Sequence, residues 1–139
     1  MLIATDADAV AEEVEAALVD AETTVERVRT GAEVTVAVDR LEPDLVVLDM
    51  QIGSMGAIAV AKALAAESTM GRLPQVATLL LLDREADTFL ANRADADGWL
   101  IKPLDAFRLR RAAQAVLAGE DYAEWPTVET VPAVAPTAD

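Results

Sequence analysis

Short apolar runs alternate with amphipathic stretches along this chain, and the alternation predicts its secondary structure. The apolar runs are too short for helices and are rich in aliphatic or β-branched side chains, so each indicates a strand. The nearly continuous run that ends at Leu82 has the pattern of a strand covered on both faces. The expected strands are residues 1–5, 23–28, 45–48, 76–82 and 99–101.

Apolar residues at helical spacing mark the segments between these strands. The segment of residues 32–41 is ambiguous, because its valines fit both the alternation of a strand and one face of a helix. We interpret it as a helix, since a strand follows and two parallel strands require a crossover between them. Asp8 is the expected N-cap of the first helix. The expected helices are residues 10–21, 32–41, 57–68, 84–94 and 105–117.

Strands that alternate with helices in this way predict one α/β domain over residues 1–118, a doubly wound parallel sheet with helices on both faces. From residue 119 onward the composition changes to an acidic, proline-containing segment without helical periodicity. We expect residues 119–139 to form a flexible tail, because such a composition cannot easily bury a core. Trp125 is the one large apolar group of this tail, and we favour packing on the domain over a role as partner anchor.

Composition narrows the possible functions. The chain has 139 residues with no cysteine and no histidine, so thiolate and imidazole chemistry are excluded. A net charge of −14 disfavours direct binding to nucleic acid, whose phosphates would be repelled. No apolar run is long enough to span a membrane, and the N-terminus lacks the pattern of a signal peptide. We therefore expect a cytoplasmic protein with protein partners.

Charged residues stand where three of the predicted strands end. Asp6 follows the first strand, Asp49 the third and Lys102 the fifth. The carboxyl ends of parallel strands meet at one edge of a sheet, where ligands and chemistry collect. If the three strands are neighbours, the two acids and the lysine form one site.

The order and spacing of these residues resemble the receiver domain of bacterial response regulators. Residues 43–50 are similar to the family's third strand, which ends in the aspartate that accepts a phosphoryl group. Lys102 and Pro103 are similar to its lysine–proline pair, and Trp99 stands at the position of its switch aromatic. The resemblance covers roughly residues 1–118 and implies a flavodoxin-like sheet of five strands in the order 2-1-3-4-5.

This resemblance implies that Asp49 takes a phosphoryl group from a sensor histidine kinase or phosphotransfer protein, with Mg²⁺ as cofactor. The implied metal ligands are Asp6, Asp49 and the backbone carbonyl of Gln51. Lys102 would pair with Asp49 at rest, and the peptide bond before Pro103 would be cis. No enzymatic activity is expected beyond phosphoryl transfer to Asp49 itself. Output would pass through a protein partner or a homodimer.

The end of the first strand departs from the family pattern of two adjacent acids. In one register Thr5 and Asp6 take the place of the pair, and Asp6 remains a direct metal ligand. In the other register Asp6 and Ala7 do so, and the direct ligand is lost. We favour the first register, because the second places Glu15 on the buried face of the following helix. With Thr5 in place of an acid, we expect weak Mg²⁺ binding.

The fourth strand departs too, because Leu82 replaces the threonine or serine whose hydroxyl bonds the phosphoryl group. Two functions therefore stay open. One is a stand-alone receiver that is phosphorylated on Asp49 and signals through protein contacts. The other is a phosphorylation-independent pseudo-receiver that acts as a protein-interaction module. A small α/β ligand-binding protein or enzyme is disfavoured, since the loop after the first strand is acidic rather than rich in glycine or hydroxyl groups.

Overall fold

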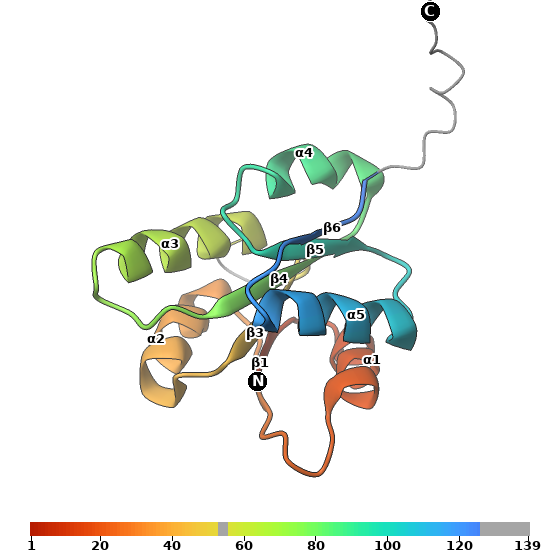
Figure 1. Ribbon diagram of the computed structural model, residues 1–139, viewed down its shortest axis with the longest axis horizontal. Helices are drawn as coiled ribbons and strands as arrows, with labels where there is room; N and C mark the ends of the chain where they lie inside the picture. The colour runs from red at the N-terminus through yellow and green to blue at the C-terminus, as the bar shows by residue number, and fades with distance from the viewer. Residues whose placement is uncertain (53–55, 126–139) are drawn as a thin grey trace, which may run out of the picture.

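A parallel sheet runs through the middle of the molecule, of which the computed structural model describes residues 1–52 and 56–125 (Figure 1). Six strands lie in the order β2-β1-β3-β4-β5-β6, and each neighbouring pair is parallel. Apolar side chains fill the central strands β1, β3 and β4, which explains their place inside the sheet. The strands are β1 (Leu2–Ala4), β2 (Glu26–Val28), β3 (Leu45–Asp49), β4 (Ala77–Leu82), β5 (Gly98–Ile101) and β6 (Tyr122–Ala123).

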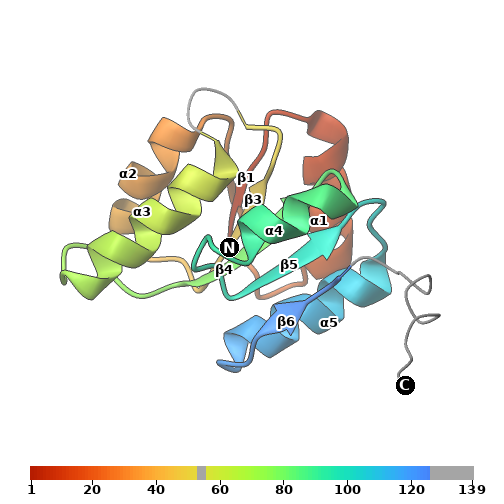
Figure 2. The same ribbon diagram turned by 90° about the horizontal axis from the view of Figure 1, so that it is seen from above.

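Helices cover both faces of the sheet (Figure 2). α1 (Asp8–Leu18) and α5 (Ala106–Leu117) pack on one face. On the other face lie α2 (Gly31–Leu41), α3 (Ala57–Thr69) and α4 (Thr88–Ala91). The 3-10 helix η1 (Glu85–Asp87) precedes α4, and none of the helices in the described ranges is long and apolar enough to cross a membrane.

Alternating side chains of each strand build two apolar cores. In β3, Val46 and Leu48 contribute to the core under α2 and α3, while Leu45 and Val47 contribute to the core under α1 and α5. All four are at most 4% exposed. This two-sided burial gives a rigid sheet, and it fixes where the carboxyl ends of the strands lie.

The sheet differs from the expected one at its edge. The predicted parallel sheet and its order 2-1-3-4-5 are confirmed, but a sixth strand, β6, adds to β5. β6 comes from the segment that we predicted to be flexible tail, and with two residues it is too short to show a periodicity in the sequence. The start of the predicted tail, residues 119–125, therefore packs on the domain, while residues 126–139 lie outside the described residues.

Two local predictions are also wrong, and one ambiguous segment is settled. Residues 32–41 are helical, within α2. Asp8 is not the N-cap of α1, because Ala7 holds that position and the Asp8 carboxylate instead accepts hydrogen bonds from Arg27 and Arg29. The expected helix at 84–94 is replaced by η1 and the short α4, after which Asp95 adopts a left-handed φ of 62°.

Candidate functional site

The sheet order brings the predicted site residues to one end of the molecule. β3 lies between β1 and β4, and β5 follows β4, so the residues after these strands are neighbours. Asp49 is the last residue of β3, Thr5 follows β1, and Asp83 follows β4. Lys102 follows β5, and its long side chain reaches across the end of β4 to Asp49.

Both carboxylate oxygens of Asp49 are occupied. Its side chain is 1% exposed. Oδ1 accepts a hydrogen bond from Lys102 Nζ at 2.5 Å, and Oδ2 accepts one from Thr5 Oγ1 at 2.5 Å. A buried carboxylate is tolerated only when it is paired and hydrogen-bonded, and these two donors meet that requirement.

Lys102 bridges two carboxylates, because its Nζ also donates to Asp83 Oδ1 at 2.7 Å. Burial lowers the pKa of the ammonium, but its hydrogen bonds to Asp49 and Asp83 outweigh this and hold the pKa above its ordinary value of 10.5. The ammonium therefore stays charged at neutral pH. The pairing with Asp83 was not predicted, although the position of Asp83 after a strand was a usable signal.

Thr5, rather than Asp6, faces Asp49. The Thr5 side chain is fully buried, and its oxygen also accepts the backbone N–H of Ala7 at 3.0 Å. The Asp6 side chain is 62% exposed and pairs with Arg29, with 3.4 Å between the nitrogen and oxygen atoms. The backbone carbonyl of Gln51, the third predicted metal ligand, accepts the N–H of Asp6 at 2.7 Å.

As arranged here, the side chains of these residues fit a magnesium ion poorly. Mg²⁺ requires oxygen ligands in near-ideal octahedral geometry, usually with one or two carboxylates free to bind it. Both oxygens of Asp49 are engaged by Thr5 and Lys102, and Asp6 is engaged by Arg29. Among the described residues, no group of three or more acidic side chains is placed to hold a metal ion. The donor set thus offers Mg²⁺ two carboxylates that already have partners, in place of an adjacent acidic pair.

Two arginines supply positive charge beside the acidic residues that follow β1. Arg27 lies on β2 and Arg29 follows it, and both donate to Asp8 Oδ1 at 2.8 Å. These hydrogen bonds lower the pKa of the Asp8 carboxyl. Sequence reasoning missed the arginines, because their approach to the end of β1 depends on the pairing of β1 with β2.

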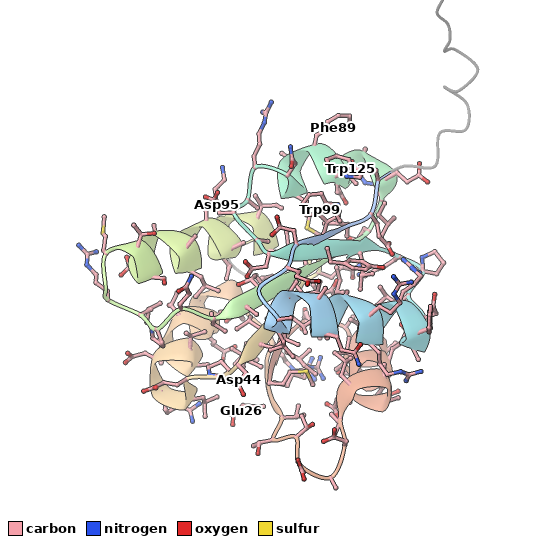
Figure 3. The ribbon with its side chains drawn as sticks, viewed as in Figure 1. Glu26, Asp44, Phe89, Asp95, Trp99 and Trp125 are labelled. Carbon is pink, nitrogen blue, oxygen red and sulfur yellow. The ribbon has the colours of Figure 1, made fainter. Side chains whose placement is uncertain are left out.

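The two predicted switch positions lie in one apolar core. Leu82 is fully buried and Trp99 is 6% exposed, and both belong to the core under α2, α3 and α4. The Trp99 indole N–H donates to the backbone carbonyl of Glu124 at 2.8 Å. Its ring meets Trp125 edge to face, with ring centroids 5.3 Å apart (Figure 3), so the preference for Trp125 packing on the domain is confirmed.

A second charged cluster, which the sequence did not reveal, lies beside β5. Arg108 on α5 donates through Nε to Glu124 Oε2 at 2.8 Å and through Nη2 to Oε1. The backbone N–H of Ile101 also donates to Glu124 Oε1, at 2.9 Å. The peptide bond between Lys102 and Pro103 is cis, as the resemblance implies, and Arg108 bonds the Pro103 carbonyl at 2.8 Å.

Comparison with known proteins agrees with this architecture. The family model described as response regulator receiver domain matches residues 1–114. A putative response regulator from Chloroflexus aurantiacus is 24% identical, with a TM-score of 0.75 over 84% of this chain and 95% of that one. The receiver domain of a signal transduction histidine kinase from Syntrophus aciditrophicus is 24% identical, with a TM-score of 0.73 over 85% and 89%.

The chemotaxis response regulator CheY4 of Vibrio cholerae is 22% identical, with a TM-score of 0.70 over 83% of this chain and 95% of that one. At these identities the structural matches establish the fold alone. No curated protein matches the chain. The family model, however, matches well over half of the sequence, and the chain therefore belongs to the response regulator receiver domains of two-component signalling.

Proposed function

We propose that this receiver domain works through protein contacts, and that phosphorylation of Asp49 is not its switch. The observation that carries the proposal is the closed network around Asp49. Thr5 and Lys102 take both carboxylate oxygens, and the side chain is 1% exposed. A nucleophilic carboxylate needs a free oxygen in line with the incoming phosphorus. Here each oxygen already accepts one hydrogen bond, and the burial of the side chain leaves little of the carboxylate open to an incoming donor.

Asp83 adds a second obstacle to phosphorylation. Its carboxylate shares the Lys102 ammonium with Asp49. A phosphoryl group on Asp49 would bring further negative charge next to Asp83, and like charges at this distance repel. The one ammonium would then face the phosphoryl group, which carries up to two negative charges, and the Asp83 carboxylate. The cluster already pairs one cation with two carboxylates at rest, so it is poorly suited to an added phosphate.

The loss of the hydroxyl at the end of β4 also supports the proposal. In the family, a hydroxyl at the end of β4 bonds the phosphoryl group, and the switch aromatic follows it inward. Leu82 has no donor for such a bond and is packed in the core. Trp99 is already buried and held by the carbonyl of Glu124. A phosphoryl group on Asp49 would thus find no partner on β4 to move.

A second candidate function is that of a phosphoacceptor, because Asp49 and Lys102 still form the ion pair that the family motif implies. Receiver domains generally take a phosphoryl group from histidine kinases or phosphotransfer proteins and generally bind Mg²⁺. In this alternative an Asp49 oxygen would bond to phosphorus as the bond between phosphorus and the donor's histidine nitrogen breaks, the histidine would leave, and the Lys102 ammonium would neutralise a phosphoryl oxygen.

Measurement of the intact mass after incubation with acetyl phosphate and Mg²⁺ distinguishes the phosphorylation-independent function from that of a phosphoacceptor. We expect no mass increase for the natural chain, as for the control Asp49→Asn. The triple variant Thr5→Asp/Leu82→Thr/Asp83→Ala restores both family residues and removes the repelling carboxylate, and we expect it to gain one phosphoryl group, which shows that the assay detects the product. One phosphoryl group on the natural chain, absent from Asp49→Asn, would overturn the proposal. A cognate kinase provides the same test with a protein donor.

A further inference from the structure

The end of the described chain lies along the edge of β5. β6 pairs with β5 in parallel, with Gly98 opposite Tyr122 and Trp99 opposite Ala123 (Figure 1). The Tyr122 N–H donates to the carbonyl of Asp97 at 3.2 Å. An uncovered strand edge offers free N–H and C=O groups to any extended chain. Residues 120–125 satisfy this edge from within the molecule.

Glu124 is bound as a ligand would be. Its two carboxylate oxygens face the planar guanidinium of Arg108, and Oε1 also takes the N–H of Ile101. The planar guanidinium of arginine can donate two parallel hydrogen bonds to one carboxylate, which no other side chain does as well. Arg108 is itself positioned by the backbone carbonyls of Ile101 and Pro103, each at 2.8 Å. The cation is thus held ready on the domain side of the contact.

The surface on either side of this clamp is shaped for a neighbouring chain. A Cβ atom on Gly98 would lie 2.6 Å from the carbonyl oxygen of Tyr122, so only glycine lets the segment approach β5 this closely. Trp99 offers its indole N–H to a backbone carbonyl and its ring edge or face to an aromatic side chain. Together with Arg108, these groups recognise an extended backbone, a carboxylate and an aromatic ring.

We propose that the edge of β5, with Arg108 and Trp99, is a docking groove for an extended segment in which a glutamate is directly followed by an aromatic residue. The chain's own segment, Glu124 and Trp125 with β6, occupies the groove in cis. A segment of the same chemistry on a partner protein binds there by displacing it. The groove is independent of the state of Asp49, and it goes beyond the function proposed above.

Charge and contact size favour an exchangeable occupant. The chain has a net charge of −14, yet α5 presents Arg108 to the acidic segment at Glu124, while Arg110 reaches the Ala17 carbonyl of α1 instead. β6 contributes only two residues to the sheet, and Trp125 remains 51% exposed. Segments with few buried contacts open locally at low cost. Addition of a strand to a sheet edge is a recurring mode of peptide recognition, with side-chain pockets giving specificity.

The test uses the full chain with Glu124→Ala/Trp125→Ala, which leaves Trp99 as the only tryptophan. The ¹⁵N-labelled variant is titrated with an unlabelled, capped peptide that has the sequence of residues 119–125. We expect the Trp99 indole N–H resonance to move saturably toward its position in the natural chain. The natural chain should need at least roughly 10-fold more peptide, because its own segment competes at an effective concentration in the millimolar range.

Two matched controls define specificity. One control is a peptide with Glu124→Lys. The other is the protein variant with an added Arg108→Lys, which keeps the charge but loses the planar fork of the guanidinium. We expect each change to leave the resonance unmoved or to weaken binding at least roughly 10-fold. No movement with the natural peptide up to about 10 mM would overturn the groove, as would equal movement with the lysine peptide. If light scattering shows a dimer of the natural chain that the double variant loses, the occupant is a second copy, and the partner assignment is overturned.

Discussion

Two cations stand near the carboxyl end of β5, and each holds more than one carboxylate. Lys102 bridges Asp49 and Asp83, whereas Arg108 holds Glu124 and Asp105. The first cluster joins the ends of three strands in the middle of the sheet. The second joins a helix to a two-residue strand at its edge. Similar ion pairs therefore lie in two different parts of the sheet, one in its middle and one at its edge.

Burial decides what each cluster can do. Opening the Lys102 cluster leaves the Asp49 carboxylate unpaired at 1% exposure, and an unpaired buried charge costs several kcal/mol. Opening the Arg108 cluster returns Glu124, whose side chain is 19% exposed, and Trp125, which is 51% exposed, to water. The first cluster is a fixed part of the fold, and the second is the one that can exchange partners. Conformational change is thus expected at the edge of the sheet.

Lys102→Met should produce the largest loss of stability. It removes the cation from a buried carboxylate and leaves Asp49 with the Thr5 hydroxyl alone, so we expect a loss of about 3–5 kcal/mol in the free energy of unfolding. Chemical denaturation at pH 7 measures it. The control is Lys62→Met on the exposed face of α3, with an expected change below about 0.5 kcal/mol. Equal stability of the two variants would show that Asp49 does not depend on Lys102.

Thr5→Asp should have the next largest effect, and it tests whether the residue at position 5 limits metal binding. The new carboxylate replaces a hydrogen-bond donor to Asp49 by a like charge, so we expect a loss of about 2 kcal/mol in EDTA. Addition of Mg²⁺ should recover much of this loss in the variant and change the natural chain little. Thr5→Ser keeps the donor and should respond to neither EDTA nor Mg²⁺. Strong stabilisation of the natural chain by Mg²⁺ would contradict our account of the donor set.

Glu124→Gln should have a smaller effect that is confined to the edge. The amide keeps one acceptor but loses the charge that faces Arg108, so we expect a loss of about 1 kcal/mol. The Trp99 indole N–H should exchange with solvent faster, because the carbonyl that accepts it lies in the released residue. The control Glu120→Gln makes the same chemical change at an exposed position. Unchanged exchange at Trp99 would mean that the charge of Glu124 is not needed to hold the segment.

The sequence predicted the sheet and the Asp49–Lys102 pair because both depend on long apolar runs and on residues directly after them. Runs such as Leu45–Asp49 specify a buried strand, and the parallel order then brings the strand ends together. β6 was not predicted, because a strand of two residues shows no periodicity in the sequence. Its position depends on a contact between Arg108 and Glu124 that no local pattern encodes. The fold and the position of Asp49 were therefore predictable, and the covered edge of β5 was not.

Acidification should weaken the contact between Arg108 and Glu124, and the free energy of unfolding should therefore depend on pH. Burial raises the pKa of Glu124, but the hydrogen bonds from Arg108 and Ile101 outweigh it, so the pKa in the folded protein lies below its ordinary value of 4.5. A carboxyl whose pKa is lower in the folded state stabilises above its ordinary pKa, and this contribution is lost as the pH falls through the folded value.

The advantage of the natural chain over Glu124→Gln should therefore be constant above about pH 5 and shrink below about pH 4.5, by up to about 1 kcal/mol. Asp105 also faces Arg108, and Tyr122 contacts Glu124, but both are present in the two proteins, so the difference isolates Glu124. Paired denaturation curves between pH 7 and pH 3 measure it. A difference that stays constant down to pH 3 would mean that the Glu124 charge does not hold the segment, and that the groove recognises backbone and aromatic ring alone.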